Sequence, residues 1–356
     1  MLNTFNLKKS VSFKTASCVL AAVIAGAALL SGCSSSTPSA SAPAPAPAGA
    51  GGASPAPAEK PLVKVTQVTN WFAQPEHGGN YTALAKGFYK EAGLDMTIQP
   101  GGPGVSATQI VGSGKAQFGM GSSDEVLLAR ERGIPIVAVM TVFQKSPQAM
   151  LVHKGQNIKS IADLNGHKVI VGSGVSFWEY FKKAYKLDKA TELKYTGDLS
   201  MFLSDPASAV QSYITSEPYV LQKKGVETES LLNADFGFAP YANLMYTTET
   251  FLKEHPDQVK AFVEATIKGW NYYKDHWQEI NPIIKKENPD NPEDVMEYSA
   301  KTLQPLVFGS DAEKNGVGYM TKERWEEMNK QLVDLGLLKA PQDVSKAFTT
   351  EFIPKK

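Results

Sequence analysis

Cysteine, arginine and histidine are scarce in this sequence. Its 356 residues include two Cys, five His and three arginines, which are Arg130, Arg132 and Arg324. Basic and acidic residues both number 36, so the chain offers no excess positive charge for binding nucleic acid. No HExxH motif occurs, and no two histidines are spaced i, i+4 as metal ligands on one helix would be. We therefore expect no nucleic-acid partner, no metal ion and no cofactor.

A long hydrophobic run is also missing. The uncharged run from Cys18 to Leu30 is too short to cross a bilayer, which takes roughly 20 apolar residues. Lysines precede this run and small residues follow it, which is the order of a secretory signal peptide. We interpret residues 1–32 as a signal peptide that is removed from the mature protein.

The end of this segment, Leu30-Ser31-Gly32-Cys33, resembles the lipobox of bacterial lipoproteins. In that motif the cysteine becomes the first mature residue and is acylated on its sulfur, so Cys33 is the predicted lipidation site. The protein is then expected to be extracytoplasmic and anchored to a membrane. It would retain no thiol for a disulfide or for catalysis, because Cys18 leaves with the signal peptide. The alternative is an ordinary cleaved signal peptide followed by an unmodified cysteine.

Residues 33–61 are Ser, Ala, Pro and Gly almost throughout and contain no bulky apolar side chain. Such a segment cannot bury enough apolar surface to offset the entropy of ordering, and its prolines keep it extended. We expect a disordered linker between the anchor and a folded body.

Beyond this linker, short apolar runs alternate with helical patterns. Val63–Val68 and Leu94–Ile98 read as strands around a helix at Tyr81–Ala92, and Ile134–Phe143 reads as a long buried strand. A helix is predicted at Ser123–Glu131, opened by the capping residues Ser122 and Ser123. The same alternation restarts near Ile158, with a strand predicted at Lys168–Val171, which indicates a second lobe. The alternation predicts an α/β fold with mostly parallel sheets. Lobe 1 is expected to begin at 62–146, lobe 2 to occupy 147–242, and the chain to return to lobe 1 with C-terminal helices at 243–356.

Apolar and aromatic residues recur at helical spacing in the last part of the chain. Val259, Phe262, Trp270 and Tyr273 share one such stripe, and a later helix carries another. We interpret these stripes as core packing and not as a cofactor site.

Four segments stand out as candidate ligand contacts, each with a structural alternative. The loop 71–81 is crowded with aromatic and polar groups but could simply pack around a buried Trp. The segment 119–123 ends in two serines that could serve only as helix caps. At 172–178 a Gly-Ser-Gly turn opens a helix without the remaining features of a dinucleotide fingerprint. At 213–219 the carboxylate of Glu217 could face a cleft or simply cap a helix.

The sequence Lys86-Gly87-Phe88-Tyr89 and the following Gly93-Leu94-Asp95 resemble the opening of solute-binding proteins of ABC importers. The combination of Trp71, His77 and Tyr81 resembles one branch of this superfamily, the proteins that bind thiamine pyrimidine precursors. That branch is related to the binders of nitrate, sulfonate and taurine. The segment Gly112–Gly119 also resembles a turn and strand of this superfamily, although Gln117 stands where the superfamily often has an acidic residue. The sequence Thr215-Ser216-Glu217-Pro218 resembles the end of a strand in the family's second lobe.

This resemblance implies a type II periplasmic binding fold, in which two α/β lobes joined by a hinge clamp a ligand. Hinge segments are expected at Phe143–Met150 and Pro240–Tyr246. The implied partners are a small-molecule ligand, an ABC permease and an ATPase, and the protein is expected to be a monomer without enzymatic activity. The predicted ligand-binding residues are Trp71, His77, Tyr81, Ser122, Ser123, Gln144, Ser173, Gly174, Phe177, Trp178, Glu217 and Tyr219.

The ligand is expected to be a small planar N-heterocycle. An anion usually needs a guanidinium or several convergent donors, whereas all three arginines are expected to face solvent. A buried Glu217 would repel an anion, while aromatic faces and hydrogen bonds from Glu217 or His77 suit a heterocycle. Two alternatives remain: a binder of a sulfonate or nitrate anion, and an enzyme like the pyrimidine-precursor synthases. The sequence does not identify the compound, its affinity, or the membrane that holds the anchor.

Overall fold

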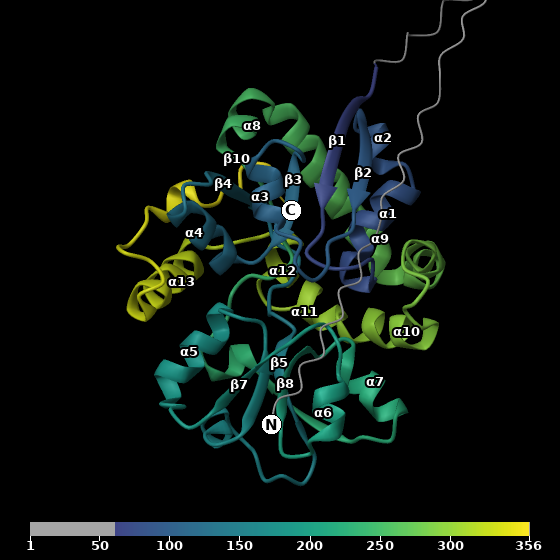
Figure 1. Cartoon of the computed structure of the whole chain (residues 1–356). Coiled ribbons are helices and arrows are strands. Elements are labelled where there is room, and N and C mark those ends of the chain that lie inside the picture. The colour runs from purple at the N-terminus through teal and green to yellow at the C-terminus, as the bar shows by residue number, and fades with distance from the viewer. Residues whose placement is uncertain (1–60, 356) are drawn as a thin grey trace, which may run out of the picture. The chain divides into compact units, whose positions relative to one another are not determined.

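The computed structural model describes residues 61–355, which contain two five-stranded sheets flanked by helices (Figure 1). The predicted signal peptide, Cys33 and the linker up to residue 60 lie outside the described residues. The first sheet has the strand order β2-β1-β3-β10-β4, and the second has the order β7-β6-β8-β5-β9. The first consists of β1 (Val63–Val68), β2 (Leu94–Gln99), β3 (Phe118–Gly121), β4 (Ile136–Met140) and β10 (Leu244–Thr248). The second consists of β5 (Gln148–His153), β6 (Lys168–Val171), β7 (Thr191–Lys194), β8 (Ala209–Tyr213) and β9 (Thr228–Leu232).

We call the first sheet with its helices lobe 1 and the second lobe 2. The chain crosses from one to the other between β4 and β5 and returns between β9 and β10. The helices of lobe 1 are η1 (Pro75–His77), α1 (Gly78–Ala85), α2 (Phe88–Glu91), α3 (Ala107–Gly112), α4 (Ser123–Glu131), α8 (Glu249–Glu254) and α9 (Pro256–Glu287). Those of lobe 2 are η2 (Ile161–Leu164), α5 (Ser176–Tyr185), α6 (Ser200–Ser204), α7 (Glu217–Lys223) and η3 (Asn233–Phe236).

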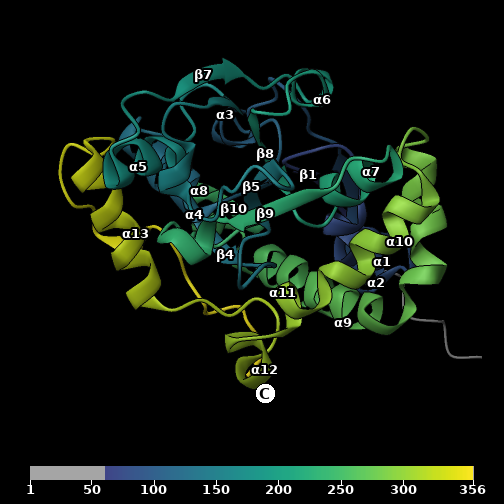
Figure 2. The ribbon, with the colours of Figure 1, turned by 90° about the horizontal axis from the view of Figure 1, so that it is seen from below.

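The last part of the chain is helical and touches both lobes. In Figure 2, α13 lies beside α5 at one side and α10 beside α7 at the other. Contacts of α13 with α4, and of α10 with η1 and α9, tie the same helices to lobe 1. The segment comprises α10 (Glu293–Thr302), α11 (Gln304–Phe308), α12 (Asp311–Asn315), α13 (Lys322–Leu335) and η4 (Val344–Lys346).

Both sheets are mixed, but four of the five strands in each point the same way, as the expectation of mostly parallel sheets requires. β1 pairs in parallel with β2 and β3, and β6 with β7 and β8. However, β10 runs antiparallel to β3 and β4, and β5 runs antiparallel to β8 and β9. These two strands are the ones that the chain enters directly from the other lobe. They therefore run against the strands that are reached by local helical crossovers.

Several predicted elements are confirmed, and others are shorter than expected. The strands at Val63–Val68 and Lys168–Val171 and the helix at Ser123–Glu131 have the predicted bounds. The helix expected at Tyr81–Ala92 is instead two helices, because Gly87 between α1 and α2 has a left-handed φ of 74°. The long apolar run that ends at Phe143 forms only the five residues of β4.

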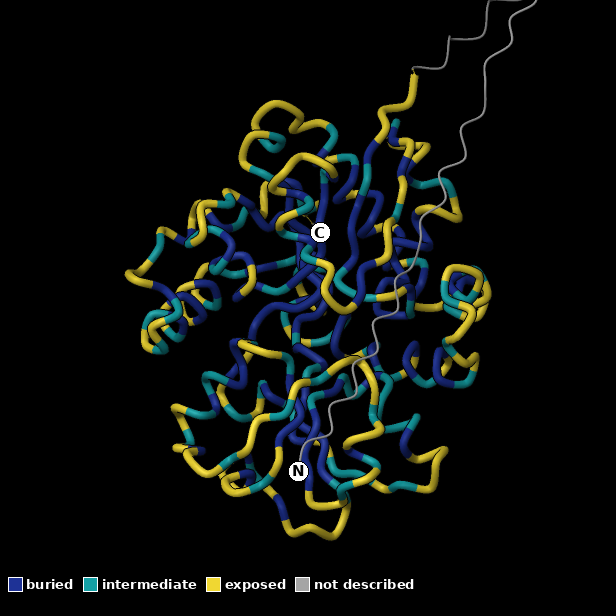
Figure 3. Tube along the Cα trace, viewed as in Figure 1, coloured by how far each residue is buried: buried dark blue, intermediate teal, exposed yellow. Residues whose placement is uncertain are grey.

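Apolar side chains of the sheets and helices form the core, as the buried strands in Figure 3 show. The aromatic stripe of α9 is confirmed as core packing: Phe262 stacks on Phe118 of β3 with ring centroids 3.8 Å apart. In α13, Trp325 is fully buried and stacks on Phe348. Gly336 ends this helix with a left-handed φ of 77°. No helix among residues 61–355 is both long and apolar enough to span a bilayer.

Candidate functional site

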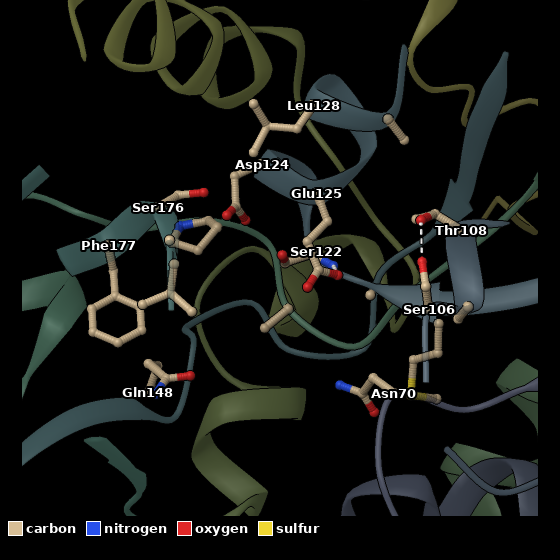
Figure 4. Close-up of a pocket in the computed structure, with 18 of the residues that line it drawn as sticks. Asn70, Ser106, Thr108, Ser122, Asp124, Glu125, Leu128, Gln148, Ser176 and Phe177 are labelled. Atoms are coloured by element: carbon tan, nitrogen blue, oxygen red, sulfur yellow. Dashed lines mark hydrogen bonds between the residues drawn. The ribbon is translucent and has the colours of Figure 1, made fainter. Parts of the chain in front are cut away.

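A cavity of about 470 Å³ lies between the two sheets and receives residues from both lobes (Figure 4). Its lobe 1 wall includes Asn70, which follows β1, and Ser122, which follows β3. Its lobe 2 wall includes Ser173, which follows β6, and Tyr213 at the end of β8. The carboxyl ends of parallel strands, where ligands of open α/β sheets bind, therefore meet here. The volume lies in the range of pockets that hold drug-sized ligands.

Two neighbouring carboxylates, Asp124 and Glu125, enter the cavity from the first turn of α4 (Figure 4). Asp124 is 7% exposed, and its Oδ1 has no hydrogen-bond partner among the described residues. Glu125 opens onto the cavity, and its Oε2 accepts a hydrogen bond from the backbone N–H of Ser122 at 3.1 Å. The side chain is exposed, yet partial loss of water beside the neighbouring protein, together with the charge of Asp124, raises its pKa to about 7. At neutral pH Glu125 can therefore accept or donate a hydrogen bond.

The start of α5 faces the cavity from lobe 2. Gly174 makes the turn with a left-handed φ of 69°, and the N-cap residue Val175 provides no side-chain hydrogen bond to the helix. The backbone N–H groups of Ser173, Gly174, Ser176 and Phe177 donate to no acceptor within residues 61–355. These groups are available to a ligand, because the first N–H groups of a helix have no partner inside it.

Further polar side chains on the cavity wall also lack partners. Asn233 of η3 is 1% exposed, and neither its amide nitrogen nor its oxygen makes a hydrogen bond to the described residues. The hydroxyl of Tyr246 in β10 is likewise buried and unpaired there. Burial and the nearby carboxylates raise the pKa of Tyr213, so this hydroxyl stays neutral and can donate. By contrast, Ser106 and Thr108 are bonded to each other at 3.1 Å.

The charge of the cavity wall is acidic. Asp124 and Glu125 contribute carboxyl groups, and Arg132 is the one basic side chain among the described residues that line the cavity. Arg132 is exposed, as expected, and its side chain also lines the cavity. The expectation that all three arginines face solvent is wrong for Arg130, which is only 14% exposed and donates to the carbonyl oxygen of Ile136 and to Glu249.

Four of the predicted ligand-binding residues line the cavity: Ser122, Ser173, Gly174 and Phe177. Phe177 is 7% exposed and meets Phe181 edge to face, so the core behind it fixes its ring. The remaining predicted residues of the described chain do not line the cavity. They are Trp71, His77, Tyr81, Ser123, Gln144, Trp178, Glu217 and Tyr219.

His77 lies one hydrogen bond behind the cavity. Its Nε2 is 3.0 Å from Oδ1 of Asn70, a lining residue whose amide nitrogen donates to Oδ1 of Asn243. Complete burial lowers the pKa of His77 to about 3, so the ring is neutral and donates to Asn70. In this structure His77 positions a lining amide and does not meet the cavity itself.

Trp178, Tyr81 and Ser123 are buried in the protein interior. Trp178 is 1% exposed, and its Nε1 donates to Glu192 at 3.1 Å. Tyr81 is 2% exposed and belongs to the core of lobe 1. Ser123 exchanges two hydrogen bonds with the backbone of Tyr241 in the return crossover. Ser123 and Trp178 each follow a lining residue, and the helical period turns them toward the core.

Gln144 and Tyr219 make structural contacts elsewhere. Gln144, in the first crossover, donates to the carbonyl oxygen of Tyr319 at 2.9 Å. Tyr219 stacks on Tyr298 of α10 with ring centroids 4.8 Å apart, and its hydroxyl donates to Asp294. Both residues therefore connect a lobe or crossover to the C-terminal helices.

Trp71 and Glu217 lie outside the lining but close to the lobe boundary. A Cβ atom on Gly197 of lobe 2 would lie 3.9 Å from the indole ring of Trp71. Glu217 is half-buried, and its Oε2 accepts from the backbone N–H of Tyr213 at 2.9 Å and from Ser216 Oγ at 2.8 Å. Burial raises the pKa of this carboxyl group. Glu217 was expected either to face a cleft or to cap a helix. Its carboxylate instead bonds to the backbone at the end of the preceding strand, β8.

A second buried carboxylate joins the two lobes. Glu76 of η1 is 1% exposed, and its Oε1 accepts hydrogen bonds from Thr215 of lobe 2 and, at 3.0 Å, from Ser299 of α10. None of the ion pairs among the described residues includes Glu76. Burial, and to a smaller extent the charge of Glu217, raises its pKa.

Sequence reasoning missed Asn70, Asp124, Glu125, Gln148 and Asn233 as lining residues. The sequence could have identified the two carboxylates, since they directly follow the serines at the end of β3. It could not have identified Asn233, because this residue becomes part of the cavity wall only when β9 pairs with β5. The described residues also contain no cluster of three or more His, Cys, Asp or Glu side chains suited to a metal ion.

A family model described as "NMT1/THI5 like" matches residues 74–280. The chain is 28% identical to the riboflavin-binding protein RibY of Chloroflexus aurantiacus, over 92% of this chain and 95% of that protein. It is 24% identical to the formylaminopyrimidine-binding protein of Halalkalibacterium halodurans, over 82% and 91%. It is 23% identical to the 4-amino-5-hydroxymethyl-2-methylpyrimidine phosphate synthase of Legionella pneumophila, over 82% and 92%.

Among solved structures, the alkanesulfonate-binding protein SsuA of Xanthomonas axonopodis pv. citri, bound to MOPS, is similar with a TM-score of 0.63. The alignment covers 82% of this chain and 99% of that one at 12% sequence identity. At such low identity the likeness shows the fold alone. The described body therefore has the type II periplasmic binding protein fold with a helical C-terminal region, as the sequence resemblance implied.

Proposed function

Because this chain belongs to the NMT1/THI5-like family, we propose that it is the solute-binding component of an ABC import system and captures a planar N-heterocycle between its lobes. The ligand is then passed unaltered to a permease, which an ATPase drives. Binding proteins for riboflavin and for a formylaminopyrimidine are both similar to this chain over more than four fifths of its length. The proposal keeps the two predicted domain boundaries, at 146/147 and 242/243, as the places where the lobes hinge.

One observation carries the choice of ligand, namely the acidic wall of the interlobe cavity. Asp124 and Glu125 enter it, while Arg132 supplies the only basic side chain among the described lining residues. A bound anion would face two carboxyl groups against one basic side chain, which disfavours it. A neutral or weakly basic heterocycle can instead donate to these carboxylates and pack against Phe177.

The alternative ligand is a sulfonate or nitrate anion, and the unpaired N–H groups at the start of α5 favour it. Helix N-termini bind anions readily. This reading requires that the α5 donors and Arg132 outweigh the two carboxylates. The second alternative is an enzyme, since a pyrimidine phosphate synthase is also among the similar proteins.

A thermal-shift screen of the full chain tests the proposal. Riboflavin, the formylaminopyrimidine, methanesulfonate and nitrate are each added, and the unfolding midpoint is measured. A ligand at 100 times its dissociation constant adds about 2.7 kcal/mol to stability, which raises the midpoint by several degrees. We expect a rise with a heterocycle and none with the anions. A rise with the anions alone would refute the ligand assignment, and conversion of the bound compound, followed by mass spectrometry, would refute the transport role.

We further propose that the protein is extracytoplasmic and held at a membrane through a lipid on Cys33, as the lipobox-like sequence indicates. Replacing this cysteine by serine removes the acylated sulfur. The wild-type chain should then fractionate with membranes and Cys33→Ser with the soluble material. Identical fractionation of the two chains would rule out the anchor.

A further inference from the structure

The two walls of the interlobe cavity differ in the hydrogen bonds that they can offer. Lobe 1 presents the carboxyl acceptors of Asp124 and Glu125 from α4, beside donors from Arg132 and the hydroxyl of Tyr246. The Oδ1 atom of Asp124 has no partner among the described residues, although the side chain is 93% removed from solvent. A buried acceptor left without a donor costs free energy, so a ligand donor at this oxygen is favourable.

Lobe 2 presents mainly donors. The N–H groups of Ser173, Gly174, Ser176 and Phe177 precede or begin α5 and have no acceptor within residues 61–355. The helix α5 is ten residues long, so its dipole adds to the positive character of this wall. The buried amide of Asn233, with both polar atoms unpaired, lines the same cavity from lobe 2.

The geometry points to a ligand of defined polarity: it carries N–H or O–H donors on the side that meets Asp124 and Glu125, and a carbonyl oxygen on the side that meets the start of α5. This inference rests on the proposed function and specifies the chemical class of the ligand. Such a molecule satisfies unpaired groups of both lobes at once. A closed state that holds it is therefore favoured over the open state only when the ligand contacts both walls.

The same arrangement explains how each wall would reject other ligands. A molecule without donors leaves Asp124 buried and unpaired. A molecule without an acceptor leaves the N–H groups of α5 unpaired when the lobes close and exclude water. Each unsatisfied buried group lowers affinity. Riboflavin and the formylaminopyrimidine both combine donors with a carbonyl oxygen, whereas the deformylated aminopyrimidine lacks the carbonyl.

Single substitutions separate the two walls. Asp124→Asn and Glu125→Gln keep the shape of each side chain and remove its charge. Ser176→Pro removes one N–H group of α5, and proline suits this first helical position because Val175 before it is extended, with φ −70° and ψ 133°. Ser176→Ala is the matched control, since it removes the hydroxyl and keeps the N–H. Glu227→Gln, at a side chain 71% exposed, is the control for loss of a carboxylate.

Calorimetric titration of the full chain with riboflavin, the formylaminopyrimidine and its deformylated analogue gives the test. We expect Asp124→Asn and Glu125→Gln to weaken binding of the carbonyl-bearing ligand roughly tenfold to a hundredfold. Ser176→Pro should weaken it about threefold to tenfold and more than Ser176→Ala does, whereas Glu227→Gln should leave it within about twofold. The deformylated analogue should bind the wild type and Ser176→Pro equally.

The outcomes separate this inference from the proposed function. A wild type that binds none of the three compounds overturns both. Binding by the wild type that Asp124→Asn, Glu125→Gln and Ser176→Pro leave unchanged overturns the polarity and leaves the transport role standing. An equal loss for the deformylated analogue in Ser176→Pro also overturns it, because the damage would then be general. Melting temperatures of the ligand-free variants identify any variant that does not fold, and Glu125→Gln then tests the acidic wall in place of Asp124→Asn.

Discussion

At the scale of single residues, the distinctive groups are carboxyls held without a cation. Glu76 joins η1 to Thr215 and Ser299 through hydrogen bonds alone, and Glu217 bonds to the backbone of Tyr213. Burial raises the pKa of both carboxyl groups. A carboxyl whose pKa is higher in the folded than in the unfolded chain stabilises the fold fully below its unfolded value. That contribution is lost as the pH rises through the folded value.

This sign predicts the effect of Glu76→Gln on stability. Glutamine keeps the oxygen that accepts from Thr215 and Ser299 but carries no charge. The melting temperature of the variant should exceed that of the wild type at pH 7, and the difference should shrink as the pH falls toward 4.5, the usual value for glutamate. Each kcal/mol corresponds to about 2 °C in a domain of this size.

The control for this prediction is Glu227→Gln, which removes an exposed carboxylate. Its effect should stay within about 0.5 kcal/mol at every pH, since the ion pair of Glu227 with Lys154 lies at the surface. If the wild type melts at a higher temperature than Glu76→Gln, and by the same difference at pH 7 and at pH 4.5, the raised pKa is contradicted.

At the scale of elements, the sequence predicted strands and helices better than it predicted side-chain directions. Propensity and capping located α4 at its observed bounds, because its start depends on residues next to one another in the chain. The same local signals did not show that Ser122 lines the cavity while Ser123 bonds to Tyr241, more than 100 residues away. Likewise, Asp124 and the start of α5 line the same cavity only because the two lobes face each other. Hydrophobic periodicity in the sequence cannot predict contacts between such distant segments.

Close packing of α1 on α9 gives an element-scale prediction. Gly79 faces Trp270, and a Cβ atom on Gly269 would lie 2.1 Å from the carbonyl oxygen of Gly79. Gly269→Ala should therefore destabilise the protein by about 1–3 kcal/mol, although alanine has the higher helix propensity. Chemical denaturation measures this loss, and Lys260→Ala on the exposed face of α9 should show almost none. A more stable Gly269→Ala would show that the two helices can separate at no cost.

At the scale of the whole described body, three kinds of connection join the two lobes. The chain crosses twice between the sheets, α10 and α13 each contact both lobes, and Glu76 bonds across the boundary to Thr215. A ligand that joins α4 to α5 would add a fourth kind. Closure would then be a shift in population toward the state in which this connection forms.

Hydrogen exchange of the full chain, with and without the heterocycle that raises its melting temperature, tests the clamp between the lobes most directly. Ligand should slow amide exchange in peptides from both walls at once, at 121–128 in lobe 1 and at 172–180 in lobe 2. Peptides from the middle of α9 should be unaffected. Protection confined to one lobe, or located away from both segments, would contradict a site shared by the two lobes.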